Sequence, residues 1–273
     1  MSAIAAPTDW TARLRVTQAR VFTSEWTKFR SLRSTRWSML VTVILTIGLP
    51  LLFAAIVGSH WAHMRPRERA DRHPLDIALA GVNLSQLAVG VLGVLVITGE
   101  YSTGMIRATL GAVPRRLPVL WAKVGVFAIV SFVLALPSVI VAFFGSQLIL
   151  NQHHILQISF SHGGVARSVV GGALYLTLIG VFALGLGAIT RNTAGGIAVF
   201  AGIMFVIPPL MNILPTNWNN AISEYLPSSA GRDVFSLTHG AHDLAPGPGL
   251  ALFVGYTALV ISVSAVLLLK RDA

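Results

Sequence analysis

The chain has 273 residues, of which 54% are hydrophobic and only 11% are charged, and its formal net charge is +10. Ordinary globular domains carry roughly 25% charged residues, so this composition cannot cover the chain with a water-soluble surface. The positive charge does not indicate a nucleic-acid partner, because the basic residues flank long apolar runs and are not gathered on a polar face. The chain has no cysteine, which excludes disulfides, Fe–S clusters and thiol catalysis. These features predict an integral membrane protein.

Six apolar runs follow one another along the chain, each long enough to cross a hydrocarbon core about 30 Å thick, which takes about 20 helical residues. They are Trp37–Gly58, Ile77–Thr98, Leu117–Ile149, Val165–Thr190, Ala194–Leu214 and Gly249–Leu269. Pro137 in the over-long third run predicts a tilt or kink, and Pro208 and Pro209 predict an irregular outer half of the fifth. Lys123 and Arg167 lie near the ends of their runs, where their side chains are expected to reach the headgroups. We therefore predict an all-α membrane protein in which residues 37–273 form one six-helix transmembrane domain.

The basic residues predict the orientation, because cytoplasmic loops carry an excess of Lys and Arg. With the N-terminus and C-terminus in the cytoplasm, 14 of the 20 Lys and Arg residues are on the cytoplasmic side. This orientation predicts a multi-pass protein of the cell membrane. Four arginines contradict the rule by falling in the first external loop, and the sequence does not explain them: Arg65, Arg67, Arg69 and Arg72. Aromatic residues in the external segment 215–248 favour short interfacial or re-entrant helices there.

Residues 1–36 carry the pattern of an amphipathic helix. On a helical wheel one face holds Leu14, Val21, Phe22, Phe29 and Leu32, with Trp26 at its edge, and the opposite face holds Arg13, Arg20, Ser24, Lys28 and Ser31. This pattern predicts a helix in the cytoplasmic interface, with its basic face toward anionic headgroups. The residues assigned to it are Phe22, Trp26, Lys28, Phe29 and Arg30. Glu25 and Gln18 fall on the apolar face and argue against it, and a disordered basic arm is the alternative.

The most informative stretch follows the second run, on the predicted cytoplasmic side. It reads Glu100-Tyr101-Ser102-Thr103-Gly104-Met105-Ile106-Arg107-Ala108-Thr109-Leu110, followed by Pro114-Arg115-Arg116 and then by Lys123. As one helix, it would place on a common side Glu100, Thr103, Gly104 and Arg107. Such a helix at the membrane surface can present a polar ridge to a soluble partner. The alternative is a loop whose arginines only follow the positive-inside rule.

This stretch resembles the signature of ABC-2-type permeases, the membrane subunits of one class of ATP-binding-cassette exporters. The family pattern is matched in order by Glu100, Tyr101, Gly104, Arg107, Leu110, Pro114, Arg116 and Lys123. The six runs, the N-terminal helix and the external segment before the last run also fit the family. The resemblance covers nearly the whole chain, although only the central motif is specific.

The resemblance implies a permease that forms the path for its cargo and is powered by a separate ATP-binding subunit, which holds ATP and Mg²⁺. It also implies a dimer with a second permease, identical or different. We assign coupling with the ATPase subunit to Glu100, Tyr101, Gly104, Arg107, Leu110, Arg115 and Arg116. Glu100 is expected to anchor this stretch through Lys28 or Arg30 of the N-terminal helix. The apolar runs slightly favour a hydrophobic or amphiphilic substrate.

The residues themselves indicate that energy for transport comes from another chain. The sequence has no Gly-x-x-x-x-Gly-Lys-Ser/Thr loop to hold phosphates, so no cofactor is predicted in this chain. Its runs lack the acidic or histidine relays that proton- or sodium-driven carriers commonly use. His153, His154 and His162 share one external segment without a ligand geometry, and neither a metal site nor enzymatic activity is predicted. The alternatives are a secondary transporter or channel, and a membrane-embedded immunity or scaffold protein, working without ATP.

Within the second run, polar and small residues form a stripe at Asn83, Gln86, Gly90 and Gly93. Glycines let helices approach closely, and side-chain amides seek partners in hydrocarbon. The stripe therefore predicts the translocation path or the dimer seam, with Asn83 and Gln86 near the outer mouth. Ordinary packing within the chain is the alternative.

Overall fold

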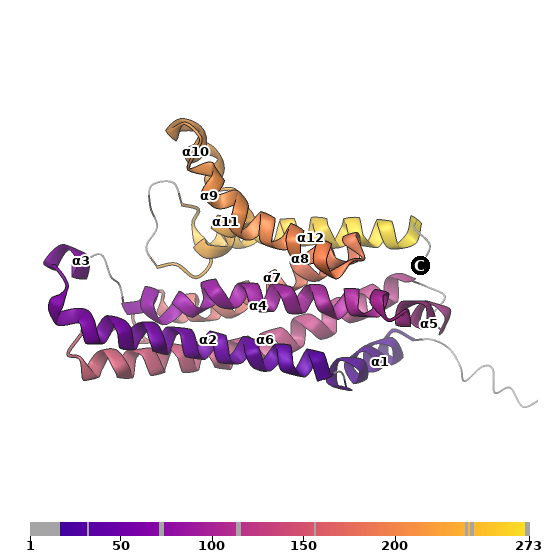
Figure 1. Cartoon of the computed structure of the whole chain (residues 1–273), viewed down its shortest axis with the longest axis horizontal. Helices are drawn as coiled ribbons and strands as arrows, with labels where there is room; N and C mark the ends of the chain where they lie inside the picture. The colour runs from indigo at the N-terminus through magenta and orange to yellow at the C-terminus, as the bar shows by residue number, and fades with distance from the viewer. Residues whose placement is uncertain are drawn as a thin grey trace, which may run out of the picture.

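The computed structural model describes residues 17–31, 33–70, 74–112, 116–155, 157–237, 240 and 243–270, and only the backbone of residues 70, 107, 108, 110 and 112. This part of the chain is helical and contains no strand. Long helices run side by side along the longest axis of the molecule (Figure 1). The predicted all-α architecture is confirmed.

Within the described residues, the chain forms long helices and short surface helices. The α-helices are α1 (Gln18–Ser31), α2 (Arg33–His60), α3 (Pro66–Ala70), α4 (Pro74–Ser102), α5 (Met105–Ala112), α6 (Arg116–Gln152), α7 (Val165–Thr190), α8 (Thr193–Ala201), α9 (Ile207–Met211), α10 (Thr216–Ser223), α11 (Pro227–Asp233) and α12 (Pro246–Lys270). Two short segments have other helical forms, the 3-10 turn η2 (Trp61–His63) and the π-helical segment η3 (Gly202–Val206).

In the part of the chain that the structure describes, six helical segments are long and apolar enough to span a membrane. They are α2 with η2, α4, α6, α7, α8 through α9, and α12. Each overlaps one predicted run, and α7 has the predicted bounds, Val165–Thr190. The six runs are therefore confirmed as helices, in an arrangement that fits a multi-pass membrane protein.

The bundle is built around α7. Of the most apolar stretch of α7, 83% is buried inside the protein, compared with 28% for α12 and 17% for the segment from α8 through α9. Glycine makes this central position possible, because a Cβ added at Gly187 of α7 would lie 3.2 Å from the backbone of Val94 on α4. The peripheral spans therefore present broad apolar faces to their surroundings.

The fifth span changes its helical form halfway. It begins after Asn192, whose side chain accepts a hydrogen bond from the Gly195 amide (2.9 Å). The π-helical η3 follows α8 and stands just before Pro208 and Pro209 in α9. Proline has no N–H and clashes with the preceding turn, so the wider π turn absorbs the interruption. The irregular outer half predicted for this run is confirmed, whereas α6 stays helical through Pro137.

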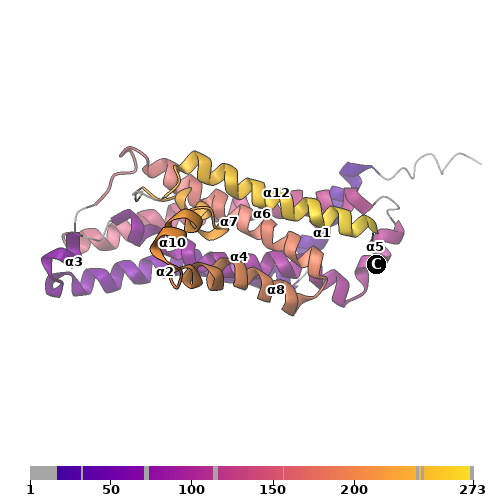
Figure 2. The same ribbon diagram turned by 90° about the horizontal axis from the view of Figure 1, so that it is seen from above.

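The two ends of the bundle carry different short helices. At one end lie α1, α5 and the end of α12, and at the other lies α3 (Figure 2). The segment before the last span forms α10 and α11, so the short helices expected in this segment are present. Of these, α11 packs against α12, and α10 projects away from the bundle (Figure 1).

Candidate functional site

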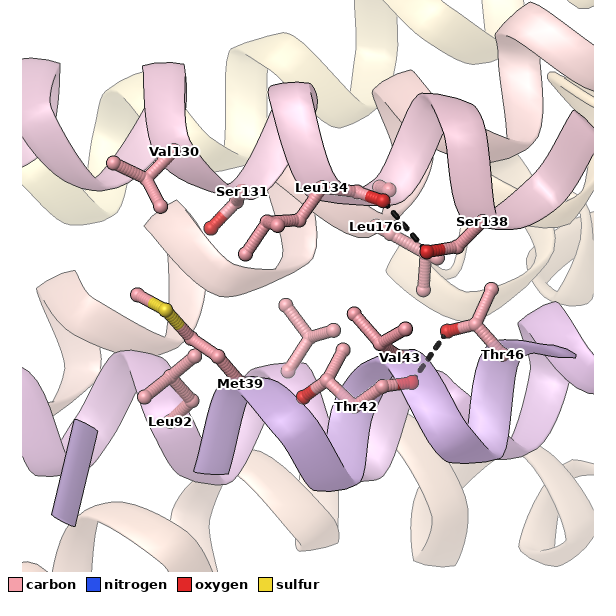
Figure 3. A pocket seen from close by; sticks show the side chains of 12 residues that line it. Met39, Thr42, Val43, Thr46, Leu92, Val130, Ser131, Leu134, Ser138 and Leu176 are labelled. Carbon is pink, nitrogen blue, oxygen red and sulfur yellow. Dashed lines mark hydrogen bonds between the residues drawn. The ribbon is translucent and has the colours of Figure 1, made fainter. Parts of the chain in front are cut away.

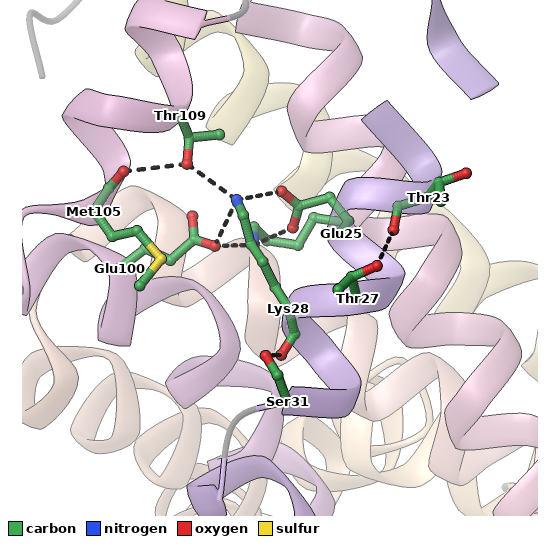
Figure 4. A network of polar contacts seen from close by, with 9 residues as sticks. Thr23, Glu25, Thr27, Lys28, Ser31, Glu100, Met105 and Thr109 are labelled. Carbon is green, nitrogen blue, oxygen red and sulfur yellow. Dashed lines mark hydrogen bonds and ion pairs between the residues drawn. The ribbon is translucent and has the colours of Figure 1, made fainter. Parts of the chain in front are cut away.

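Four charged side chains meet inside the bundle, at the end that carries α1 and α5. We call them the ionic cluster, and they are Glu25 and Lys28 of α1, Glu100 of α4 and Lys123 of α6. Lys123 Nζ lies 2.6 Å from Glu25 Oε2 and 2.8 Å from Glu100 Oε1. Lys28 Nζ lies 2.7 Å from Glu25 Oε1 and 3.3 Å from Glu100 Oε1. Each ammonium group therefore bridges both carboxylates (Figure 4).

The ionic cluster is withdrawn from solvent. The exposed fraction is 3% for Glu25, 4% for Glu100 and 5% for Lys123, while the Lys28 side chain keeps 23%. An isolated charge buried in this way would be very unfavourable, whereas the charges of two lysines and two glutamates balance one another. The expectation that Lys123 reaches the headgroups is wrong, because its ammonium group is turned inward to meet the two carboxylates.

The neighbouring lysines set the protonation state of Glu25. Burial alone would raise the pKa of its carboxyl, but the ammonium groups of Lys123 and Lys28 outweigh burial and hold the pKa below its usual range. Glu25 is therefore ionised at neutral pH. Its contribution to stability is fully present above the usual pKa of a glutamate and is lost as the pH falls through the lowered value.

The ionic cluster also explains how α1 is held. Glu25 and Gln18, which interrupt the apolar face in the sequence, are the residues that fix this helix to α6. Gln18 Nε2 donates a hydrogen bond to the Pro118 carbonyl (3.1 Å). Glu25 pairs with Lys123 of the same helix. The Phe29 ring meets Phe127 of α6 edge-on, with the ring centroids 6.2 Å apart. This face of α1 therefore packs against protein.

The other residues of the predicted interfacial helix divide between protein and surface. Val21 is buried, and Phe22 is half-buried against the bundle. Trp26, which is 43% exposed, and Arg30 face outward. Three residues of the wheel lie outside the described residues: Arg13, Leu14 and Leu32. The position of α1 at a membrane surface stays a prediction.

The stretch expected to form one helix is divided by Gly104. Helix α4 ends at Ser102, Gly104 adopts a left-handed φ of 71°, and α5 begins at Met105. A left-handed residue ends a helix, and glycine adopts this conformation without the steric penalty of a side chain. Glu100 and Arg107 therefore stand on different helices, and the common polar face predicted for them is wrong. Glu100 points into the bundle from the last turns of α4.

Helix α5 is nevertheless attached to the ionic cluster. Lys28 Nζ donates a hydrogen bond to Thr109 Oγ1 of α5 (3.0 Å), so the ammonium group that bridges both carboxylates also holds this helix (Figure 4). The contact predicted between Glu100 and the N-terminal helix is confirmed at Lys28. Three residues assigned to coupling have no described side chain: Arg107, Leu110 and Arg115. Their coupling roles stay predictions.

Tyr101 and Arg116 of the same motif make contacts within the chain. The half-buried Tyr101 ring centroid lies 5.3 Å from the guanidinium carbon of Arg191, which follows α7, in cation–π geometry. Arg116 donates a hydrogen bond to the Leu268 carbonyl (3.0 Å) near the end of α12, where a helix presents carbonyls without intrahelical partners. The motif therefore joins α4, α6, α7 and α12 at one end of the bundle.

The glycines of the α4 stripe are covered by other helices of the same chain. A Cβ added at Gly90 would lie 2.1 Å from the Phe200 ring of α8. One added at Gly93 would lie 2.2 Å from the carbonyl oxygen of Gly180 on α7. No side chain fits at either distance, so both glycines permit close helix contacts. This favours ordinary packing within the chain, the alternative to a path or a dimer seam at these two positions.

Gln86 is also turned inward. It is buried, and its Oε1 accepts a hydrogen bond from the buried hydroxyl of Tyr175 on α7. Replacing Gln86 by leucine should leave this hydroxyl without its acceptor and lower the free energy of unfolding by about 1–3 kcal/mol, as measured by SDS titration of detergent-solubilised protein. In the Gln86→Leu background, Tyr175→Phe should lower the free energy of unfolding only a little further. Fully additive losses would show that the two side chains act independently.

Asn83 lines a polar cavity at the other end of the bundle. The cavity has a volume of about 330 Å³ and is lined by Asp76, Leu79, Asn83, Ser229, Arg232, Asp233, Phe235, Ser236 and Asp243. Backbone amides bind two of its carboxylates, because Leu244 donates to Asp233 (3.1 Å) and Gly240 donates to Asp243 (2.6 Å). Across the described residues, no three acidic or histidine side chains are placed to hold a metal ion. The sequence pattern indicates only Asn83 among the residues of this cavity, because distant segments without a common spacing build its other walls.

Another cavity, with mainly apolar walls, lies in the middle of the bundle between α2, α4, α6 and α7 (Figure 3). Hydroxyl groups on its walls are bound to their own helices: Thr46 donates to the Thr42 carbonyl (2.8 Å) and Ser138 to the Leu134 carbonyl (2.7 Å). Its volume of about 20 Å³ is enough for about one water molecule. This cavity is too small to hold a larger molecule.

Two arginines, Arg69 of α3 and Arg167 of α7, are bound to nearby backbone. The Arg69 guanidinium donates to the central carbonyl of η2 (2.9 Å) and lies 5.8 Å from the centroid of the Trp61 ring, which fixes α3 against η2. Arg167 donates to the Ser236 carbonyl (3.0 Å) in the segment before α12. Arg72 lies outside the described residues. Arg69 and Arg167 therefore have structural contacts at this end of the bundle.

No protein-family model and no curated protein sequence matches this chain. The residues that carry its function therefore have to be inferred from its own motif and from the geometry of the ionic cluster. The two coincide at Glu100, which opens the motif and lies within the cluster. This coincidence makes the ionic cluster and α5 the candidate functional site.

Proposed function

We propose that this chain is the permease subunit of an ABC-2-type ATP-binding-cassette exporter and forms the membrane path for a hydrophobic or amphiphilic substrate. The observation that carries the proposal is the ionic cluster, because it joins Glu100, which opens the family motif, to helices α1 and α6 and to α5. A separate subunit binds ATP and Mg²⁺ and supplies the energy. Under this proposal the protein lies in the plasma membrane with both termini in the cytoplasm, so the cluster is at the cytoplasmic end.

The ionic cluster supports a route for force from an ATPase subunit. Helix α5 is a short helix between two spans, and Thr109 connects it to Lys28. A subunit that docks on α5 would displace Lys28 and, through it, the carboxylates of Glu25 and Glu100. A partner can bias the bundle only if it makes different contacts in two states of the bundle. Short, buried ion pairs that link α1, α4 and α6 suit this requirement, because they pass a displacement on without absorbing it.

The peripheral spans support a second permease copy. Helix α12 exposes large apolar side chains at Val254, Leu259, Val263 and Val266, and a Cβ added at Gly255 of the same helix would meet open space. In membranes, such faces meet lipid or pack against another helix. We expect the active complex to contain two permease copies and two ATPase subunits. A mass measurement in nanodiscs that finds one permease copy per active complex would contradict this expectation.

Charge reversal at Arg107 tests the proposal. The chain would be purified together with the ATP-binding-cassette subunit that it captures in the membrane. We expect Arg107→Glu to reduce both the captured subunit and its stimulated ATP hydrolysis by roughly tenfold or more, because hydrogen bonds to charged groups contribute about 1.5–3 kcal/mol. The permease itself should still insert and dimerise, which size-exclusion chromatography of the variant would check.

Arg67→Glu is the matched control, because Arg67 is an exposed arginine of α3 at the opposite end of the bundle. This variant should capture the ATPase subunit like the wild-type chain. Unchanged capture and hydrolysis in Arg107→Glu would remove α5 from the mechanism. If the wild-type chain captures no ATP-binding subunit, the proposal fails, and a transporter, channel or scaffold that works without ATP is favoured.

A further inference from the structure

A groove of about 160 Å³ lies between α2 and α4 and leads to the ionic cluster. Leu92 and Leu95 form its apolar wall on α4. Toward the end of α4, hydroxyl side chains such as Ser102 and Thr103 replace the apolar ones, and Glu100 lies among them. The groove is therefore amphiphilic along its length, with the polar end at the same end of the bundle as α5.

One atom of the ionic cluster has no hydrogen-bond partner. Glu100 Oε1 accepts hydrogen bonds from both lysines, whereas Oε2 is buried and unpaired. Glu100 lines both the groove and the small cavity inside the ionic cluster, and the two spaces also share Thr35 and Val96. A buried carboxylate oxygen without a donor is unfavourable. A donor group that arrives along the groove would satisfy this oxygen.

The polar end of the groove presents hydrogen-bond acceptors. The hydroxyls of Ser102 and Thr103 both donate to the Gly99 carbonyl (3.0 and 2.8 Å), which leaves lone pairs on their oxygens. Lys28 and Lys123 line the cluster cavity, where their ammonium groups bond the other oxygen of the Glu100 carboxylate. A carboxylate and hydroxyl oxygens therefore line this groove, although the net charge of the chain is +10.

We propose that the groove binds a long-chain primary amine, with its ammonium group on Glu100 Oε2 and its hydrocarbon chain along Leu92 and Leu95. An ammonium group carries three donors, which suit the carboxylate and the hydroxyl oxygens of Ser102 and Thr103. A carboxylate headgroup in the same place has no hydrogen-bond donor to offer Glu100 Oε2. Binding in the groove does not depend on ATP-driven export. Under the proposed function, such amines are the substrate class, and the groove is one of their binding sites.

Photolabelling of the full chain in nanodiscs, without ATP or an ATPase subunit, tests this site. The probe is a long-chain primary amine with a diazirine at the end of its chain. We expect labelled peptides from α2 and α4, and we expect dodecylamine to compete roughly tenfold or more better than dodecanoate, the factor that a hydrogen bond to a charged group provides. Equal competition by dodecanoate would overturn the proposal and show that the probe only partitions into the bilayer.

Gly99→Leu is the variant that fills the groove. Gly99 lines it, and a Cβ added there has no atom within 4 Å, so the larger side chain enters open space. Labelling of α2 and α4 should fall by roughly tenfold, as when a hydrogen bond to a charged group is lost. The matched control is Gly247→Leu in the first turn of α12, which also enters open space and should keep full labelling. The thermal stability of both variants separates loss of the site from loss of the fold.

Labelling of α2 and α4 that survives Gly99→Leu in a stably folded variant would overturn the proposal. The result is distinguishable from the test of the export function, because no ATPase subunit takes part. Capture of an ATPase subunit without amine binding would leave the permease function and remove this ligand. Amine binding without such capture would leave the site and remove ATP-driven export.

Discussion

Replacing Lys123 by methionine should lower the free energy of unfolding by about 3–5 kcal/mol. The side chain is 5% exposed and pairs with Glu25 at 2.6 Å and with Glu100 at 2.8 Å. Its removal leaves two buried carboxylates to share the ammonium group of Lys28, so one of them must be protonated or moved toward water. SDS titration of the detergent-solubilised protein measures the change. Lys270→Met, at the exposed end of α12, is the control and should change the free energy by less than about 0.5 kcal/mol.

A second substitution separates charge from packing in this experiment. In the Lys123→Met background, Glu25→Gln removes the surplus negative charge and leaves the pair of Glu100 with Lys28. The double variant should therefore regain about 1–3 kcal/mol relative to Lys123→Met alone. If the two losses simply add, the ion pairs are independent of one another, and the ionic cluster does not act as a unit.

The spans could be predicted from the sequence because hydrocarbon imposes a minimum length and an apolar composition on each helix that crosses it. The run Val165–Thr190 matches α7 at both ends. The irregular fifth span could also be predicted, because Pro208 and Pro209 cannot continue the regular hydrogen-bond pattern. These features depend on local residues alone, which is why a single sequence carries them.

The ionic cluster could not be predicted in this way. Glu25 and Lys123 pair across 98 positions of the chain, so no local spacing connects them. In the sequence, Glu25 interrupts an apolar face, and Lys123 resembles a residue that reaches the headgroups. The charge of Glu25 on the apolar face is explained by its pairing with Lys123, and the inward position of Lys123 is explained by its pairing with Glu25. The available signal was Glu25 itself, because a charge on a face that becomes buried must find an opposite charge.

The break between α4 and α5 depends on a signal that the motif obscured. The spacing of Glu100 and Arg107 suits one continuous helix, but Gly104 stands between them with a left-handed φ of 71°. Glycine after a long apolar run is a common helix end. The local rule was therefore present in the sequence, and the assumption of one helix across the motif was the source of the error.

A single methyl group added at Gly93 should lower the free energy of unfolding about as much as the loss of a core contact does. In Gly93→Ala the new Cβ would lie 2.2 Å from the Gly180 carbonyl oxygen and 3.1 Å from the Leu184 amide nitrogen. Both atoms belong to the backbone of α7, so no side-chain rotation can relieve the clash. Contacts between carbon and oxygen are normally about 3.3–3.6 Å, so α4 and α7 must separate by roughly 1 Å. Overpacking of this kind costs about 1–3 kcal/mol, and we expect the upper end, measured by SDS titration.

The same displacement should reach the ionic cluster. Gly93 and Glu100 are seven positions apart, so they lie on one face of α4, roughly 10 Å apart along its axis. Moving α4 away from α7 therefore shifts Glu100 relative to Lys123, and the losses from Gly93→Ala and Lys123→Met should differ from additivity by about 0.5–3 kcal/mol. Gly99→Ala is the matched control, because a Cβ there has no atom within 4 Å, and it should leave stability unchanged or slightly higher. Equal stability of the two alanine variants would contradict the close contact between α4 and α7.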